Sequence, residues 1–218
     1  SKDVGTQIQA KHDIQLKSGG ATSIQAGVIN SKEGNVVIDA TKGLSVTEGR
    51  ETSAHALSTH EQRSNAVSSS RKDNLLEERE NLAVASVISG KQIVLNSGQD
   101  ITIQGSNVVS DELTQIQAKE NISITAAENQ YAKVSESTVK KSGFTGSLSD
   151  GVASVGYGKT NIKQDNKSQS TSLTQSVVGS VNGNTNIVAG EDLSAVASII
   201  EAGKDINLIG KNVHLDAA

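Results

Sequence analysis

Short stretches in which apolar and polar residues alternate recur along the whole chain. Each begins with Asn, Asp, Gln or Gly and continues as apolar, any residue, apolar, which is the pattern of a β-strand with one buried face. These units are DIQL (13–16), NVVI (35–38), GLSV (43–46), QIVL (92–95), DITI (100–103), NISI (121–124), DLSA (192–195), DINL (205–208) and NVHL (212–215). The pattern predicts an all-β chain of short strands.

The spacing of these units predicts a coil. Some units start 7 or 8 residues apart and others start 20 to 22 residues apart. Longer repeats agree with this: TQIQAK occurs at 6–11 and again at 114–119, and ASVISGKQIVL (85–95) returns as ASIIEAGKDINL (197–208). Repetition of this kind is typical of a solenoid. We therefore expect a parallel β-helix, or β-solenoid, with two or three strands in each turn and roughly six turns.

Two polar stretches interrupt the strand units. The units fall in three blocks, about 1–47, 85–128 and 179–218, and the excursions between them are about 48–84 and 129–178. We expect residues 1–218 to form a single β-solenoid with both excursions as β-hairpins along its flank.

The two excursions have different sequence features. A helical interpretation of the first rests on Leu75, Leu76, Arg79 and Leu82, but the Ser and Asn residues around them disfavour a helix. The second has a Gly-rich centre, which predicts a long hairpin with its turn within 143–158.

The composition narrows the kind of core. The aromatic residues are Tyr131, Phe144 and Tyr157, and Met, Trp, Cys and Pro are absent, so the core must consist of Val, Ile, Leu and Ala. A narrow stack in which like residues lie about 4.8 Å apart suits these side chains. Asn, Asp and Gly suit the corners, because they tolerate left-handed backbone or make local hydrogen bonds.

Charge and hydropathy exclude several classes of function. The net charge is −4 and aromatic residues are 1% of the chain, which argues against a nucleic-acid partner. The absence of Cys excludes disulfides and thiolate metal sites. No apolar run approaches the ~18 residues of a membrane span. The start, SKDVGTQIQA, has no apolar signal core, so we interpret the chain as an internal fragment.

One motif suggests a nucleotide site. The stretch ASVGYGKT (153–160) fits a loose form of the phosphate-loop pattern. A phosphate loop needs a buried strand before it and a helix after it, and neither is indicated here. We therefore interpret it as part of a Gly-rich hairpin and expect no cofactor.

Several segments together resemble a known family. They are ENQYAKVSESTVKKSGFTG (128–146), SGQDITIQGSNVVSDE (97–112) and GSVNGNTNIVAGEDLSAVASIIEAGKDINLIGKNVHLDA (179–217). They resemble the haemagglutinin repeats of two-partner-secretion exoproteins, which include filamentous haemagglutinin adhesins and the effectors of contact-dependent growth inhibition. The most specific motifs are KKSGFTG and the coil motif AG.D(I/L).

The resemblance implies a fold, a location and partners. It implies a right-handed parallel β-helix, secreted through an outer-membrane transporter partner and displayed on the surface of a Gram-negative bacterium. In the growth-inhibition effectors this region is implicated in passing a C-terminal toxin across the target cell's outer membrane. The alternatives are an adhesin stalk that binds a surface receptor and a carbohydrate-active β-helix enzyme. We expect no enzyme activity, because the family supplies no catalytic residues.

The candidate site residues are few. The cluster of Lys140 and Lys141 beside Phe144 is a candidate contact with a membrane or a partner. We expect no catalytic or metal site: Asp13, Asp100, Asp192 and Asp205 fit corner positions better than a catalytic cluster.

Two further expectations concern the histidines and the ends of the rod. His55 and His60 lie in a polar excursion without a partnering carboxylate pattern, which favours a solvated pair. A rod with exposed ends should also self-associate end to end.

Overall fold

The computed structural model describes residues 1–149 and 152–218, which contain β-strands and no helix. These residues form two compact units. The coil unit comprises residues 1–51, 82–129 and 172–218, and the hairpin unit comprises residues 52–81 and 130–171.

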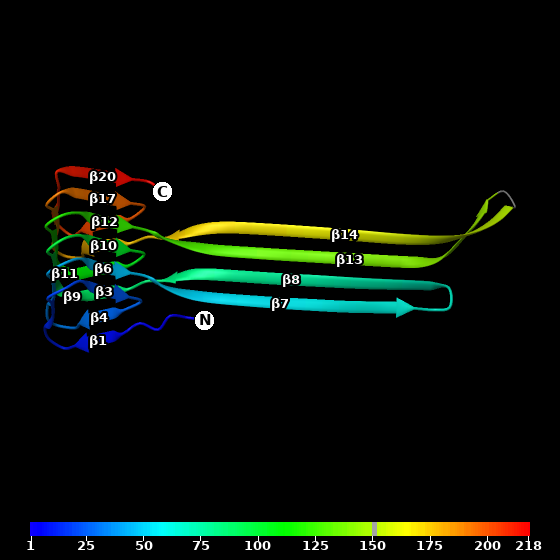
Figure 1. The fold of residues 1–218 in the computed structure, drawn as a ribbon, viewed down its shortest axis with the longest axis horizontal. Coiled ribbons are helices and arrows are strands. Elements are labelled where there is room, and N and C mark those ends of the chain that lie inside the picture. Colours follow the sequence, from blue (N-terminus) through cyan, green and yellow to red (C-terminus); the bar gives the residue numbers. More distant parts are fainter. Residues whose placement is uncertain (150–151) are drawn as a thin grey trace. The chain divides into compact units, whose positions relative to one another are not determined.

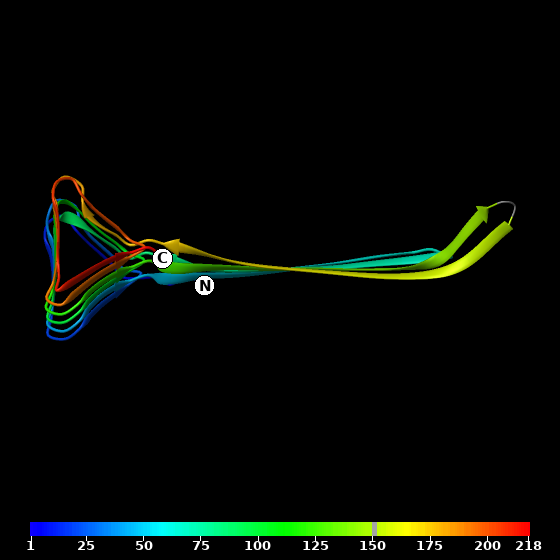
Figure 2. The same cartoon turned by 90° about the horizontal axis from the view of Figure 1, so that it is seen from above.

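The coil unit is a parallel β-helix with three faces (Figures 1 and 2). The first face contains β1 (Gln7–Ala10), β4 (Val28–Ser31), β15 (Val177–Ser180), β18 (Ile199–Ala202) and the first parts of β9 (Val87–Ser97) and β11 (Asn107–Ala118). The second contains β2 (Ile14–Ser18), β5 (Val36–Ala40), β16 (Asn184–Ala189), β19 (Ile206–Ile209) and the remaining parts of β9 and β11. The third contains β3 (Thr22–Gln25), β6 (Leu44–Thr47), β10 (Ile101–Gln104), β12 (Ile122–Thr125), β17 (Asp192–Val196) and β20 (Asn212–Asp216).

The six-stranded third face fixes the number of turns. Each of its strands belongs to a different turn, so the described residues form six turns. The structure thus confirms the expected β-solenoid.

The core is a set of columns of aliphatic side chains. One column on the third face runs through residues paired in register from turn to turn: Ile24, Val46, Ile103, Ile124, Ala195 and Leu215. Ile103 and Ile124, in the middle of this column, are fully buried. Stacking of this kind buries small aliphatic residues without any aromatic side chain, which explains the composition.

The first face carries a pattern that the strand units did not include. Each of its strands has one large inward residue, such as Ile29 or Val108, followed two positions later by a small residue, which in β4, β11 and β15 is a buried serine, as at Ser31 and Ser110. The second large apolar residue of the unit is therefore missing on this face.

The repeated hexapeptide TQIQAK does not mark equivalent turns. Residues 7–10 of the first copy form β1 on the first face, whereas residues 114–118 of the second copy lie in β11 on the second face. In both copies Ile and Ala are more buried than the two Gln residues, because the alternation is the same. The longer repeat does mark equivalent turns, since both copies start on the first face and continue on the second.

The two excursions form one sheet. The hairpin unit contains most of β7 (Gly49–Ser64) and β8 (Ser68–Val84) from the first excursion and of β13 (Ala127–Ser149) and β14 (Val152–Thr174) from the second, and the bases of these strands belong to the coil unit. Their order is β14-β13-β8-β7, so the two hairpins pair through β8 and β13, which are antiparallel (Figure 1). No described side chain of this unit is buried. The sheet therefore depends on its ladder hydrogen bonds and cross-strand pairs rather than on a core.

The hairpin expectation was right for both excursions, and the helical alternative for the first was wrong. Leu75 and Leu76 lie in the strand β8. The turn between β7 and β8 is closed by two hydrogen bonds. The backbone N–H of Asn65 donates to Ser68 O at 2.9 Å, and Asn65 Oδ1 accepts from Ser68 N at 2.7 Å. In the second hairpin, β13 ends at Ser149 and β14 begins at Val152. Residues 150–151 between them, where the turn was expected, lie outside the described residues.

The glycines of the AG.D motif lie where two turns come closest. A Cβ on Gly190 would lie 2.0 Å from Lys119 O, and one on Gly203 would lie 2.2 Å from Val181 O. In both cases the obstructing atom belongs to the backbone of the preceding turn. The motif therefore needs glycine for close packing of successive turns.

At the corner before the third face, the residues of the last four turns form a ladder in which Asp and Asn alternate. Asp100 Oδ1 accepts from the backbone N–H and the side-chain amide of Asn121, at 3.0 and 2.9 Å. Asn121 Oδ1 accepts from Asp192 N at 3.2 Å, and Asp192 Oδ1 accepts from the Asn212 amide at 2.7 Å. The amide residues separate the carboxylates, so like charges do not stack on successive turns.

Replacing Asn121 by Asp should destabilise the coil by about 2 kcal/mol at pH 7, because it removes a donor to Asp100 and places three carboxylates on successive turns. The crowding should raise the pKa of the new carboxyl. The loss should therefore shrink as the pH falls towards about 4, where that group becomes protonated. Urea unfolding at both pH values measures the effect.

The matched control is Asn186→Asp, because its neighbours in register, Gln115 and Asn207, are both amides. A loss that is equal for the two variants, or that does not depend on pH, would contradict the role of charge separation.

The last turn leaves its inward side chains exposed. Ile206 is 45% exposed and Leu215 is 61% exposed, although both continue columns that are buried in earlier turns. The expected end-to-end association stays a prediction.

Candidate anion-contact site on the hairpin sheet

The candidate residues Lys140, Lys141 and Phe144 lie near the end of β13 that pairs with the beginning of β8. Side chains alternate between the two faces of a strand. Lys140 and Phe144 therefore share one face of the sheet, and Lys141 lies on the other. The structure thus divides the three residues between two surfaces.

Lys140 lies directly opposite Arg71 in the β13–β8 pair. Lys159 of β14 lines the same hollow of about 510 Å³ as these two residues. The other lining residues are Gln62, Ser69, Lys141, Ser142, Thr160 and Asn161, and none of them is acidic. Like charges opposite each other destabilise a sheet unless an anion lies between them.

Arg71 is held by an acidic neighbour at the edge of this hollow. Its Nε donates to Asp73 Oδ2 at 2.8 Å, and the other carboxylate oxygen of Asp73 contacts Nδ1 of His60. Hydrogen bonds from His60 and Arg71 hold the pKa of the Asp73 carboxyl below its usual range. The expectation that His60 has no carboxylate partner is therefore wrong. This contact contributes stability above the usual pKa of Asp and is lost as the pH falls through the lowered value.

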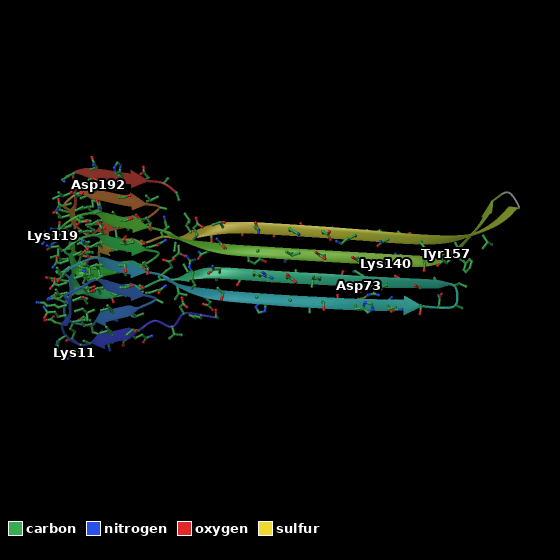
Figure 3. All side chains as sticks on the ribbon, in the orientation of Figure 1. Lys11, Asp73, Lys119, Lys140, Tyr157 and Asp192 are labelled. Atoms are coloured by element: carbon green, nitrogen blue, oxygen red, sulfur yellow. The ribbon has the colours of Figure 1, made fainter. Side chains whose placement is uncertain are left out.

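Lys140 and Lys159 differ from Arg71 in their surroundings. In the described part of the chain, no ion pair neutralises either ammonium group. Figure 3 shows Lys140, Tyr157 and Asp73 along the strands of the hairpin sheet. The two lysines are thus free to bind an external anion.

Two aromatic side chains accompany these cations. The rings of Phe144 and Tyr157 meet edge to face, with centroids 5.4 Å apart and planes 66° apart. Both are exposed, at 62% and 56%. Lys159 Nζ lies 5.9 Å from the Tyr157 ring centroid. We call Arg71, Lys140, Phe144, Tyr157 and Lys159 the basic-aromatic patch.

A second hollow lies at the same end of the sheet. Lys141 lies opposite Ser70 and shares a hollow of about 600 Å³ with Arg63 and Thr160. The other lining residues are Ser64, Asn65, Ser68, Ser69, Ser142, Gly143, Phe144 and Gly158. This surface offers hydroxyl groups and two cations, but it holds neither Lys140 nor Lys159.

At the other end of the hairpin unit the charges are neutralised internally. Lys133 Nζ lies 2.9 Å from Glu78 Oε1, and the Tyr131 hydroxyl donates to the same oxygen at 3.2 Å. The hydrogen bond from Lys133 is the main reason that the pKa of Glu78 lies below its usual range. The unpaired positive charge is therefore concentrated near the turns of the sheet.

The phosphate-loop interpretation has no support in the fold. Residues 153–160 lie within the strand β14, and no helix follows them in the described part of the chain. Lys159 and Thr160 line the surface hollows of the sheet instead. The motif contributes to the patch through its lysine and Tyr157, not through a phosphate loop.

The acidic corner residues are used by the coil itself. Asp13 Oδ1 accepts from Asn35 N at 2.8 Å, and Asp100 and Asp192 belong to the ladder of the third face. Among the described residues, no three His, Cys, Asp or Glu side chains are placed to hold a metal ion. The described chain also has no helix with the length and apolar character of a membrane span.

A comparison with known protein families identifies the family of this chain. Residues 67–218, more than half of the chain, match the family described as Hemagglutinin repeat. The chain belongs to the haemagglutinin repeat family. No solved structure matches the chain significantly.

The chain is also similar to parts of much longer proteins. The chain is 29% identical over 216 residues to "tRNA nuclease CdiA-2" of Burkholderia pseudomallei, covering 98% of this chain and 7% of that protein. It is 35% identical over 137 residues to "Toxin CdiA" of Yersinia pestis, covering 63% of this chain and 4% of that protein. The chain thus spans only a small part of these relatives.

These matches confirm the expected family and its setting as a segment of a large secreted, cell-surface exoprotein. The nuclease activity in the relatives' names belongs to those proteins, and the haemagglutinin repeat itself is structural.

Proposed function

We propose that this chain serves in toxin delivery: its coil is a spacer in a growth-inhibition effector, and its hairpin unit contacts the phosphate groups of the target cell's outer membrane. Export through an outer-membrane transporter is part of this proposal. Similarity to the proteins named "tRNA nuclease CdiA-2" and "Toxin CdiA", over 98% and 63% of the chain, supports it.

The observation that carries the membrane contact is the basic-aromatic patch. Lys140 and Lys159 have no ion-pair partner among the described residues and face the same hollow. Phosphate groups are the natural ligands of such unpaired cations. The exposed rings of Phe144 and Tyr157 suit the boundary between headgroups and apolar chains, where amphipathic aromatic residues collect.

The architecture of the hairpin unit also supports a surface contact. Its sheet has no buried side chain in the described residues, so both of its faces offer side chains to a partner. Leu57, Val67 and Ile162 are each more than half exposed. Apolar side chains exposed in this number favour an interaction surface.

Neutralising the two free lysines should weaken binding to anionic membranes. The double variant Lys140→Gln and Lys159→Gln should bind vesicles of phosphatidylglycerol in phosphatidylcholine about 30-fold less tightly, since a lysine near an anionic surface contributes ~1 kcal/mol. Co-sedimentation with vesicles at low salt measures this. The affinity of the unmodified chain should fall as salt rises, because screening weakens the attraction.

The matched control is Lys11→Gln with Lys119→Gln, which changes the net charge equally but lies on the coil (Figure 3). An equal loss for both pairs would indicate a general charge effect and contradict a role of the patch. Binding that is unchanged in the Lys140 and Lys159 variant would contradict it too.

An adhesin stalk is the second candidate function. It predicts binding to a protein receptor, with an affinity that does not follow the anionic lipid content of the surface.

A further inference from the structure

The first residues of the chain pair with the base of β7. Lys2 and Glu51 form an antiparallel bridge. The backbone N–H of Asp3 donates to Arg50 O at 2.8 Å, and Arg50 N donates to Asp3 Oδ2 at 2.8 Å. Lys2 Nζ also lies 3.2 Å from Glu51 Oε2. Residues 2–3 thus lie along β7 as the end of an antiparallel strand does.

This short pairing has the same register as the pairing between the two hairpins. Asp3 lies four residues before the start of β1, and Ala83 lies four residues before the start of β9. Glu51 and Asn129 each lie four residues after the ends of β6 and β12. In the β8–β13 ladder Asn81 pairs with Gln130, so the next residue of β8 is in register with Asn129. These two positions correspond to Lys2 and Glu51, and the bridge between Lys2 and Glu51 therefore has the same register as the β8–β13 ladder.

The corners of the coil support this equivalence. Between the third face of one turn and the first face of the next, three corners are short and turn through one residue of positive φ: Ala26 at 50°, Gly105 at 51° and Ala197 at 46°. These corners alternate with the two positions at which the hairpins leave the coil, after β6 and after β12. The position before β1, where residues 2–3 pair with β7, is the next one in this alternation.

The edge of β7 is open beyond this base. In the sheet order β14-β13-β8-β7, β7 is an outer strand. Asn65 N bonds to Ser68 O, so the odd-numbered residues of β7 exchange hydrogen bonds with β8. The backbone N–H groups of Ala54, Ala56 and Ser58 therefore point to the open edge. An open row of N–H and C=O groups is a template for another strand.

We propose that the open edge of β7 is the docking site of one particular strand: the second strand of a preceding hairpin, formed by the residues directly before Ser1 in the longer protein. It continues the register of Lys2 and Glu51. The hairpin sheet is then one part of a ribbon in which each hairpin pairs with the hairpin two turns away. This inference concerns assembly within the exoprotein and does not depend on the proposed membrane contact.

Disulfide trapping tests the register. In the longer chain, a cysteine placed five residues before Ser1 should lie opposite Leu57, in a pair without hydrogen bonds whose side chains are close. With Leu57→Cys it should cross-link within one molecule at least about tenfold faster than with Ser58→Cys, whose side chain lies on the other face. Equal rates, or cross-links only between two molecules, would overturn the proposal.

Hydrogen exchange tests the same edge without substitutions. The amides of Ala54, Ala56 and Ser58 should exchange at least about tenfold more slowly in the longer chain than in residues 1–218. Equally fast exchange in both chains would overturn the proposal. Slow exchange in residues 1–218 that depends on protein concentration would show a second copy on this edge, which would overturn it as well.

Discussion

Replacing Gly190 by Ala should lower the free energy of unfolding of the coil by about 3 kcal/mol. The new Cβ would lie 2.0 Å from Lys119 O, which is backbone of the preceding turn and cannot rotate away. To make room, the two turns must separate and stretch the parallel ladder on both sides of the corner. Overpacking usually costs about 1–3 kcal/mol, and we expect the upper end because no side chain can yield. Urea unfolding followed by circular dichroism measures the loss.

Gly19→Ala is the matched control. A Cβ at Gly19 meets no atom within 4 Å, so its substitution should change the free energy of unfolding by less than about 0.5 kcal/mol. If Gly190→Ala is as mild as Gly19→Ala, close packing of turns is not the reason for the glycine in the AG.D motif.

Removing both hairpins should leave the coil folded. The short corner Gly105-Ser106 provides the template: residues 48–85 and 126–175 are each replaced by one glycine, which joins Thr47 to Ser86 and Thr125 to Ser176. Ser86, Ser106 and Ser176 are all fully buried and occupy equivalent corners, since Ser86 N donates to Ser106 Oγ and Ser106 N donates to Ser176 Oγ.

The core columns lie entirely in the coil unit, so we expect the free energy of unfolding to change by less than about 2 kcal/mol. Thermal unfolding of the shortened chain should remain cooperative. Loss of the β-sheet circular dichroism signal would contradict an independent coil.

The same excision has a functional readout in the full-length exoprotein. Cells that display it should adhere to target cells as before, and toxin entry should be lost because the proposed membrane contact is missing. The control is an excision of the first hairpin alone, which leaves Lys140, Phe144 and Lys159 in place. Unimpaired killing by the double excision would contradict a role of the hairpin unit in delivery.

The sequence predicted the coil because two of its faces repeat a simple pattern. On the second and third faces, strands such as DITI and NISI present two large aliphatic residues to the core, and their spacing marks the turns. The first face was missed because its second inward position is small, as at Ser31 and Ser110. From the sequence alone, a serine is interpreted as a polar residue on the surface, although these serines lie inside a narrow corner.

The pairing between the two hairpins could not be predicted from the sequence, for a different reason. Register is encoded in a strand when one face is buried, and the hairpin strands have no buried face to encode it. The motif KKSGFTG therefore identified Lys140 and Phe144 but not their neighbours. Arg71 and Lys159 join them only through cross-strand pairing between distant segments.

The ladder of Asp100, Asn121, Asp192 and Asn212 has a period of two turns, and so do the hairpin positions along the coil. Loss of the single turn that carries Asn121 would bring Asp100 and Asp192 onto neighbouring turns, and gain or loss of any single turn would put the hairpins out of step. Gain or loss of a pair of turns preserves both. Length differences among repeats of this kind should therefore come in steps of two turns and one hairpin, which makes that larger block the unit of evolutionary duplication.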